Sequence, residues 1–340
     1  MISVLLVDDS SLTRAVLRDI FLATDDIVVA GEAKNGEEAV AMIRMLAPDL
    51  VIMDLMMPVM DGLAAIEEIM AHFPTPILVL SATLDDREVN RAFIAIKKGA
   101  LDVMEKPDGA DLKLAESFEV RIIEKVRLLA GIKVIRRPVK RHMAAPKITS
   151  PVGGDRNILA IGASTGGPKA VMTIVKRLPA ELRATVFIVQ HIASGFARGF
   201  AKWLDSESRM RVRLAVDGDD FKIGEALVAP NDCHMVSERG KIRLVQDAPV
   251  NCCRPSIDVF FNSLAADQGA RVVGVLLTGM GKDGALGLRR IKEQGGVTIA
   301  QDKESCAVFG MPKAALELNA VDEVLPLSEI PGAVVRIFGK

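Results

Sequence analysis

Short apolar runs alternate with amphipathic stretches along the first 130 residues of the chain. The apolar runs predict strands at residues 2–7, 27–31, 49–53, 76–80 and 101–104, and the stretches between them predict helices at about 12–22, 36–46, 60–71, 86–97 and 111–130. The predicted strands are apolar almost throughout, so both of their faces are buried, which is typical of a parallel sheet between two layers of helices. We therefore expect residues 1–130 to form an α/β domain with a doubly wound parallel sheet.

A second series of the same kind starts at residue 156. It predicts strands near 157–162, 185–190, 225–229, 271–277 and 296–300, with helices between them. Within it, the segment HMVSERGKIRLVQD (234–247) predicts an antiparallel hairpin that turns at Arg239-Gly240. We expect residues 156–340 to form a second doubly wound, mainly parallel α/β domain that carries this hairpin as an addition.

Residues 131–155 interrupt both patterns. This segment contains three prolines, six lysines or arginines and one acidic residue, and its apolar residues show no period. Such a composition is typical of a solvated linker, although its basic charge leaves open a docking role toward an acidic partner. The predicted organisation is therefore a domain over 1–130, a linker over 131–155 and a domain over 156–340.

Composition narrows the classes of protein that the chain can represent. Of 340 residues, 50% are hydrophobic and 26% are charged, and the formal net charge is −1. The hydrophobic residues are numerous enough to form the cores of two domains. The near-zero net charge gives no excess of positive charge that would attract nucleic acid or a membrane surface. The longest apolar runs have the length of strands, and the first ten residues lack the basic segment of a signal peptide. We expect a cytoplasmic protein with no membrane insertion and no nucleic-acid partner.

All four cysteines lie in the second half of the chain. Cys233, Cys252, Cys253 and Cys306 do not have the spacing that metal ligands show. We interpret them as small buried hydrophobic residues, because free cysteine is among the residue types most often buried.

Polar residues follow four of the five strands predicted for the first domain. They are Asp8 and Asp9 after the first strand, Asp54 after the third, Ser81 after the fourth and Lys106 after the fifth. The carboxyl ends of parallel strands meet at one edge of the sheet, so we expect these side chains to lie together. Clustered carboxylates require a cation, for which Mg²⁺ is suited, and the lysine can hold a phosphoryl group.

This set of residues, with the segments DDSSLTR and MDLMMPVMDG, resembles the receiver domain of two-component response regulators over about residues 1–125. The resemblance implies that Asp54 takes a phosphoryl group from the phosphohistidine of a sensor kinase. It further implies an Mg²⁺ ion held by Asp8, Asp9, Asp54 and the backbone carbonyl of Met56, with Ser81 and Lys106 binding the phosphoryl oxygens. Val103 stands where many receivers carry an aromatic residue.

In the second domain, residues 162–166 follow a predicted strand and match G-x-S-x-G, the pattern of a nucleophile elbow. A glycine-rich turn can instead cradle a phosphate, but the dinucleotide fingerprint requires a glycine where Ser164 stands and an acidic residue where Gln190 and His191 stand. The Walker pattern fails too, because Lys282 is followed by Asp283. The pattern therefore favours the nucleophile.

A serine nucleophile requires a base, and the chain has four histidines. We expect His72 and His142 to be solvated bystanders. His191 directly follows a predicted strand and is the favoured base, whereas His234 is either a structural residue or the alternative base. Asp283, in a glycine-rich turn after the strongest predicted strand, is the candidate for the orienting carboxylate, and an N-cap of the helix predicted at 284–294 is its alternative role.

The segments GASTGGP, VQHIASGFA, APNDCHM, RPSID, LLTGMGKDGALG and AQDKESCAVFGMP resemble the CheB-type chemotaxis methylesterases over about residues 155–338. The resemblance implies that Ser164 is the nucleophile, His191 the general base and acid, and Asp283 the orienting carboxylate. The backbone N–H groups near Thr165 and Met280 are the oxyanion donors by analogy.

The same resemblance implies hydrolysis of glutamate γ-methyl esters on the cytoplasmic helices of methylated chemoreceptors, often with deamidation of glutamines. The phosphodonor would be a chemotaxis sensor histidine kinase, and the esterase would need no cofactor. Two other functions remain as alternatives: a regulator whose second domain only binds receptors, and a DNA-binding response regulator. The latter requires a basic recognition helix, which the near-neutral second half does not provide.

Overall fold

The protein is described by a computed structural model that covers residues 1–81, 86–106, 112–132, 134 and 156–339. The chain divides into two compact units, Met1–His142 and Met143–Lys340. The linker predicted at 131–155 lies almost entirely outside the described residues. Among the described helices, none has both the length and the apolar character that crossing a bilayer requires.

The first unit contains a five-stranded parallel sheet, as the apolar runs predict, and its strand order is β2-β1-β3-β4-β5. Its strands are β1 (Ile2–Val7), β2 (Ile27–Ala33), β3 (Leu50–Asp54), β4 (Ile77–Ser81) and β5 (Asp102–Glu105). The helices that alternate with them are α1 (Ser11–Leu22), α2 (Gly36–Leu46), α3 (Gly62–His72), α4 (Asp86–Lys98) and α5 (Leu112–Leu129).

The first three helices of this unit begin at residues whose side chains cap them. Ser10, Asn35 and Asp61 accept hydrogen bonds from the backbone N–H groups three residues further on. Phe21 of α1 and Ile122 of α5 share one buried cluster with the strands, so these two helices cover the same face of the sheet.

The second unit contains a seven-stranded parallel sheet in the order β14-β13-β12-β6-β7-β9-β8. Its strands are β6 (Ile158–Ala163), β7 (Thr185–Gln190), β8 (Arg211–Leu214), β9 (Glu225–Val228), β12 (Val272–Leu276), β13 (Val297–Gln301) and β14 (Glu323–Leu325). Both edge strands, β8 and β14, are missing from the predicted elements. They are short and carry charged residues, which is how natural sheets protect their edges and why no apolar run marks them.

The predicted hairpin is present as β10 (His234–Glu238) and β11 (Lys241–Val245), which pair in antiparallel fashion. Its two turn residues, Arg239 and Gly240, both have positive φ angles, 52° and 73°. These angles belong to the two-residue turn whose twist matches that of the flanking strands.

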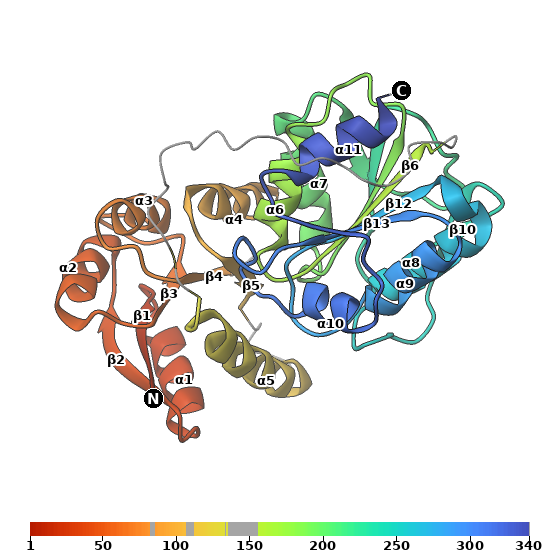
Figure 1. The fold of residues 1–340 in the computed structure, drawn as a ribbon. Helices are drawn as coiled ribbons and strands as arrows, with labels where there is room; N and C mark the ends of the chain where they lie inside the picture. The colour runs from red at the N-terminus through yellow and green to blue at the C-terminus, as the bar shows by residue number, and fades with distance from the viewer. Residues whose placement is uncertain (82–85, 107–111, 133, 135–155, 340) are drawn as a thin grey trace. The chain divides into compact units, whose positions relative to one another are not determined.

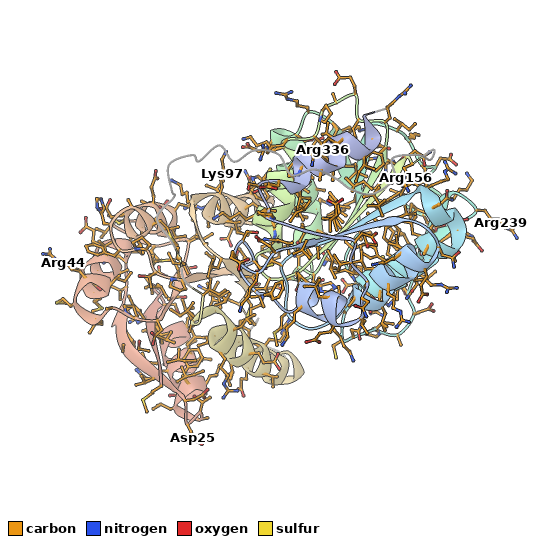
Figure 2. All side chains as sticks on the ribbon, in the orientation of Figure 1. Asp25, Arg44, Lys97, Arg156, Arg239 and Arg336 are labelled. Carbon is orange, nitrogen blue, oxygen red and sulfur yellow. The ribbon has the colours of Figure 1, made fainter. Side chains whose placement is uncertain are left out.

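Helices cover both faces of the second sheet (Figure 1). One layer contains α6 (Gly167–Val175), α7 (Phe196–Glu207) and α11 (Ile330–Phe338), and the other contains α8 (Ile257–Gln268), α9 (Ala285–Glu293) and α10 (Met311–Glu317), with a 3₁₀ turn at Gly269–Arg271. Phe187, Phe260 and Phe261 are fully buried between the sheet and the second layer. Charged side chains such as Asp25, Arg44 and Arg239 point away from their units (Figure 2).

Candidate active site and phospho-acceptor site

In the first unit, strand register brings the predicted phosphoryl-site residues to one edge of the sheet. Val7 pairs with Met53, Asp54 with Leu80, and Ser81 with Glu105, so the residues that end β1, β3, β4 and β5 are neighbours. Asp8, Asp54 and Ser81 are buried. This edge corresponds to the carboxyl ends of the strands, where open α/β sheets bind their ligands.

Lys106 links two of the carboxylates at this edge. Its Nζ atom lies 2.7 Å from Oδ2 of Asp8 and 3.0 Å from Oδ1 of Asp54. Burial raises the pKa of Asp54, and the positive charge of Lys106 offsets only part of that rise. Burial alone would lower the pKa of Lys106, but the charges of Asp54 and Asp8 raise it, so the ammonium is retained.

The carboxylates at this edge form a donor set that fits Mg²⁺. Asp8, Asp9 and Asp54 offer oxygen atoms that all lie within 4.8 Å of one another, and hard oxygen ligands are what this ion prefers. Ser81 donates through Oγ to Oε2 of Glu88 at 3.1 Å. Met56, whose carbonyl the resemblance assigns to the ion, lies two residues beyond the end of β3 with an exposed side chain.

In the second unit, two neighbouring strands end immediately before Ser164 and His191. The N–H of Ser164 donates to the carbonyl of Thr278 at 3.0 Å, and the N–H of His191 donates to the carbonyl of Ala163 at 2.9 Å. The chain leaves β6 toward β7 on one side, and its later part returns to β12 on the other, so this edge is a switch point of the sheet.

Glycines allow the backbone to approach closely around Ser164. Gly166 has a φ angle of 74°, which permits the sharp turn from β6 into α6. A Cβ atom on Gly279 would lie 2.7 Å from Cβ of Ser164 and 2.3 Å from Sδ of Met311. The loop after β12 is therefore packed directly against the serine.

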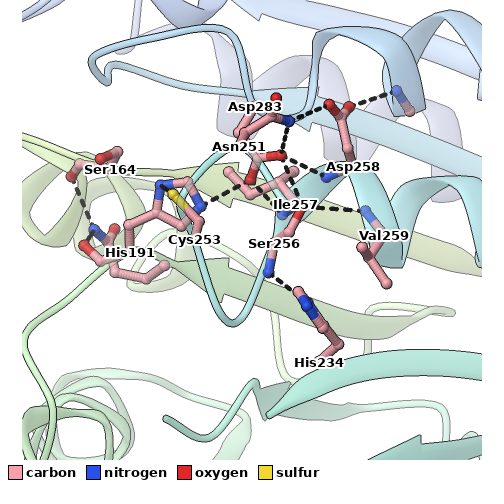
Figure 3. A network of polar contacts seen from close by, with 12 residues as sticks. Ser164, His191, His234, Asn251, Cys253, Ser256, Ile257, Asp258, Val259 and Asp283 are labelled. Atoms are coloured by element: carbon pink, nitrogen blue, oxygen red, sulfur yellow. Dashed lines mark hydrogen bonds and ion pairs between the residues drawn. The ribbon is translucent and has the colours of Figure 1, made fainter. Parts of the chain in front are cut away.

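His191 and Asp283 form a hydrogen-bonded pair, with Nε2 of the ring 2.9 Å from Oδ2 of the carboxylate (Figure 3). Asp283 also accepts hydrogen bonds from Nδ2 of Asn251 at 2.8 Å and Oγ of Ser256 at 2.8 Å. The backbone N–H groups of Ile257 and Asp258 add bonds of 2.6 and 3.2 Å. All of these donors converge on one buried carboxylate.

Two of these donors are the first N–H groups of α8, which have no partner within the helix, so Asp283 accepts the hydrogen bonds that they would otherwise lack. The alternative role considered for Asp283, an N-cap of the helix at 284–294, is wrong, because that helix begins at Ala285 and its N-cap residue is Gly284. The carboxylate faces back across the loop toward α8 and not along its own helix.

The pair has opposite pKa shifts. Burial favours the neutral ring, yet the hydrogen bonds with Asp283 and Cys253 and the charges of both groups outweigh it and raise the pKa of His191 to about 9. Burial raises the pKa of Asp283, but the hydrogen bond and charge of His191, with the bonds from Asn251 and Ser256, lower it to about 2. The carboxylate is therefore ionised and can stabilise an imidazolium.

Ser164 is close to this pair without being bonded to it. Within the described part of the chain, its Oγ atom makes no hydrogen bond, although its main chain is fixed by Thr278 and by Nε2 of Gln190, which donates to its carbonyl at 2.8 Å. Gln190 also donates to the carbonyl of His191 at 2.8 Å, so one side chain ties both segments together. Catalytic hydrogen bonds are often long before substrate binds.

Of the other described histidines, neither is bonded to Ser164, His191 or Asp283. His234 is buried, accepts from the N–H of Ser256 at Nδ1, and lies 3.1 Å from the carbonyl of Ala248 through Nε2. Both of its nitrogens are engaged with backbone, so its structural role is the correct one of the two expected. His72 is exposed and pairs with Glu68, and His142 lies outside the described residues.

The predicted oxyanion donors lie in the turn after β6 and in the loop after β12. Thr165 follows it directly and is buried, and its carbonyl accepts from Oγ1 of Thr278 at 3.0 Å. Met280, which follows Gly279, is half exposed. Counting described residues only, neither the N–H of Thr165 nor that of Met280 donates a hydrogen bond, so both are available to a ligand.

Residues 250–258 complete the site, and of these the resemblance marked only the segment RPSID. Asn251 bridges the carboxylates of Asp258 and Asp283 with bonds of 2.9 and 2.8 Å. Cys253 lies with Sγ 3.6 Å from Nδ1 of His191. The segment NCCRPSID, which combines an amide, thiols and an N-cap serine before a helix, was the available signal in the sequence.

The interpretation of the cysteines as buried hydrophobic residues is wrong. Cys252 is exposed, and Cys233, Cys253 and Cys306 are only partly buried. Cys252 lies at the tip of a tight turn that is closed by backbone hydrogen bonds between Val250 and Cys253, and its side chain is exposed there.

Comparisons with known proteins identify the families of both domains. Residues 159–334 match the CheB methylesterase family, and residues 4–116 match the response regulator receiver domain family. A protein-glutamate methylesterase/protein-glutamine glutaminase of Anaeromyxobacter dehalogenans is 47% identical over 336 residues, which cover 98% of this chain and 96% of that protein. A protein of the same name from Methanococcoides burtonii is 40% identical over 99% of this chain and 98% of its own length.

Among solved structures, the Thermotoga maritima CheB methylesterase catalytic domain is similar with a TM-score of 0.52 and 39% sequence identity. The similarity covers 54% of this chain and 98% of that domain. With a matching family over more than half of its length and relatives aligned from end to end, the chain belongs to the CheB methylesterases, which here follow a response-regulator receiver domain.

Proposed function

We propose that Ser164, His191 and Asp283 make this chain a protein-glutamate methylesterase that the phosphorylation of Asp54 regulates. The observation that carries the proposal is the His191–Asp283 hydrogen bond of 2.9 Å at the strand end beside the turn that bears Ser164. A serine beside an imidazole that is hydrogen-bonded to a buried ionised carboxylate supplies the parts that serine hydrolysis requires.

The tautomer of the base follows from its partners. Because Asp283 takes the Nε2–H bond, Nδ1 is the nitrogen that accepts the proton of Ser164. The deprotonated Oγ attacks the ester carbonyl, and the oxyanion that forms is stabilised by the N–H groups of Thr165 and Met280, each worth about 3 kcal/mol. His191 then gives its proton to the departing methoxide, which leaves as methanol.

The acyl-enzyme is then hydrolysed with the help of the same groups. A water molecule gives a proton to Nδ1 of His191 and attacks the acyl carbonyl, and Ser164 recovers the proton as it leaves. A glutamine side chain that takes the place of the ester would release ammonia and the same glutamate. This supports a protein-glutaminase activity, which the names of the relatives also carry.

On this proposal the substrates are the methylated cytoplasmic helices of chemoreceptors and the phosphodonor is a chemotaxis sensor histidine kinase, which places the protein in the cytoplasm. Asp54 is the phospho-acceptor, and Ser81 and Lys106 bind the phosphoryl oxygens. Asp8, Asp9, Asp54 and the carbonyl of Met56 would hold Mg²⁺, which neutralises the charge of the aspartates and the phosphoryl group when bound. Residues 131–155 would link the two domains.

The test is methanol release from methylated receptor. Ser164→Ala is expected to lower turnover by at least about 10³-fold, whereas Ser206→Ala, which changes a serine bonded within its own helix, serves as the matched control. Undiminished release by Ser164→Ala would exclude this nucleophile. Asp54→Asn should lose the response to a small phosphodonor with Mg²⁺, and full activation of that variant would exclude the regulatory part of the proposal.

A further inference from the structure

A tight turn fixes Cys253 beside His191. The turn from Val250 to Cys253 is closed by two backbone hydrogen bonds of 3.1 and 2.9 Å, and its central residues Asn251 and Cys252 have φ angles of 51° and 61°. The side chain of Asn251 anchors the turn by bridging Asp258 and Asp283. The backbone at Cys253 is therefore held by the closed turn and by the half-buried Asn251 amide, and not left as a free loop.

The separation of the sulfur from the imidazole has the value expected for two ligands of one zinc ion. Sγ of Cys253 lies 3.6 Å from Nδ1 of His191. Bond lengths of about 2.3 Å for Zn–S and about 2.0 Å for Zn–N at a tetrahedral angle place the two atoms about 3.5 Å apart. The two donors thus already have the spacing that such an ion requires.

Asp283 would hold the His191 ligand in place without binding the metal ion itself. The thiol, imidazole and carboxylate offer donor atoms that all lie within 4.8 Å of one another, but both Asp283 oxygens already accept hydrogen bonds. One of these involves Nε2 of His191. A metal-binding histidine characteristically donates its second ring N–H to a carboxylate, which fixes the ring and the tautomer.

We propose that Cys253 and His191 form a binding site for a thiophilic divalent metal ion such as Zn²⁺, and that the bound ion inhibits the esterase. The thiolate contributes Sγ, the imidazole contributes Nδ1, and water completes the tetrahedron. Two protein ligands are one fewer than catalytic zinc sites use, so occupancy is expected to be reversible.

The inhibition rests on the proposed function, because the metal ion takes the nitrogen that would accept the proton of Ser164. Binding converts the Cys253 thiol to a metal thiolate and releases one proton, and a protonated His191 ring releases a second. Zn²⁺ affinity should therefore increase with pH. Cys252, exposed on the same turn, provides the control for thiols that bind metal without this geometry.

The first measurement is direct binding of Zn²⁺ to the full chain, by competition with a chromogenic chelator in excess Mg²⁺, which occupies the carboxylates of the receiver. Zn²⁺ affinity is expected to fall at least about tenfold in Cys253→Ser and to remain in Cys252→Ser. Co²⁺ in place of Zn²⁺ should give a thiolate charge-transfer band that Cys253→Ser lacks. Equal Zn²⁺ affinity of the wild-type chain and Cys253→Ser would overturn the proposal.

The second measurement locates the ion. Zn²⁺ is expected to protect Cys253 from iodoacetamide while Cys252 remains reactive, as read by peptide mass spectrometry, and equal alkylation of Cys253 with and without Zn²⁺ would overturn the site. Zn²⁺ should also inhibit methanol release, reversibly with EDTA, in the wild-type chain more strongly than in Cys253→Ser, each compared with its own metal-free rate.

The two proposals fail in different measurements. Retained activity in Ser164→Ala contradicts the proposed function while Zn²⁺ binding is unaffected. Absent Zn²⁺ binding contradicts the metal site while Ser164-dependent hydrolysis remains.

Discussion

The His191 ring is hydrogen-bonded to Asp283 through Nε2, which leaves Nδ1 as the nitrogen that faces Cys253. The base must be neutral to accept a proton, and the pKa of His191 is raised to about 9. We expect kcat/KM on a small neutral ester to rise with pH through a midpoint near this value. Cys253→Ser removes one of the contacts that raise the pKa, so its rising limb should move to lower pH. A rise centred near pH 6.5 in the wild-type chain would contradict this.

The same pKa shift predicts how stability depends on pH. The folded-state value lies above the ordinary value of about 6.5, so protonation of His191 stabilises the fold fully below about pH 6.5, and this contribution is lost as pH rises through about 9. Thermal denaturation of the wild-type chain should therefore show a stability loss over this interval that His191→Gln lacks. Parallel curves for the two proteins would show that the ring is not coupled to folding.

Replacing Asp283 by asparagine should affect both rate and stability. The amide keeps the size of the side chain but cannot hold the ring in the required tautomer, and a loss of about 10⁴-fold in turnover is expected. Its N–H₂ group would also oppose the N–H donors at the start of α8, at a cost of about 1–3 kcal/mol in the free energy of unfolding. Asp220→Asn, which changes an exposed carboxylate paired with Lys241, is the control. An active Asp283→Asn would exclude the orienting role.

Asn251 can be tested with two variants that separate its side chain from its backbone. Asn251→Gly keeps the positive φ angle of 51° without strain and removes only the amide between Asp258 and Asp283. It should lower turnover about tenfold or more, because two buried carboxylates lose their shared donor. Asn251→Ala should be less stable than Asn251→Gly by about 1 kcal/mol because of backbone strain. Full activity in both variants would show that the amide does not position Asp283.

Gly279 is expected to tolerate no side chain. The Cβ atom of Gly279→Ala would lie 2.7 Å from Cβ of Ser164. A displacement of the serine by about 1 Å can cost about 10²-fold in rate, so activity should fall more than stability. Gly332→Ala, whose Cβ would meet nothing closer than 3.4 Å in α11, is the matched control. Normal methanol release by Gly279→Ala would mean that the loop after β12 can shift to accommodate the methyl group without displacing Ser164.

The predicted phosphoryl site of the first unit can be tested through Lys106. Lys106→Met removes the ammonium that lies 2.7 Å from Asp8 and 3.0 Å from Asp54, so the pKa of Asp54, already raised by burial, should rise further. We expect the phosphodonor to activate this variant little, although it remains folded. Circular dichroism and the response of methanol release to phosphodonor check the two parts, and an unimpaired response would remove Lys106 from the phosphoryl site.

The parallel character and the buried faces of both sheets were predictable, because runs such as ILAIGA and TVFIVQ have no polar alternation. The pairing of His191 with Asp283 was predictable for a related reason, since His191 directly follows β7, Asp283 lies in the loop after β12, and the carboxyl ends of parallel strands meet at one edge. Both are consequences of local pattern and sheet topology, which the sequence carries directly.

The surroundings of that pair were not predictable in the same way. Asn251 and Cys253 lie on a turn that no periodicity marks, and they reach His191 and Asp283 only through tertiary contact. Cys252 has a positive φ angle although it is not a glycine, so the local sequence does not indicate this backbone conformation either. The partner of the Asp283 carboxylate at the start of α8 depends on how two helices cross, which is set by packing.

Among the described residues, all of those that hydrogen-bond to the Asp283 carboxylate or to the His191 ring belong to Met143–Lys340. On the proposed function, phosphorylation of Asp54 therefore has no bond to make at the reacting centre. On this proposal we expect phosphorylation to change how often a receptor side chain is captured more than the rate at which a captured ester reacts. Phosphodonor should thus raise kcat/KM for the receptor far more than for a small ester, which makes the receiver a regulator of encounter.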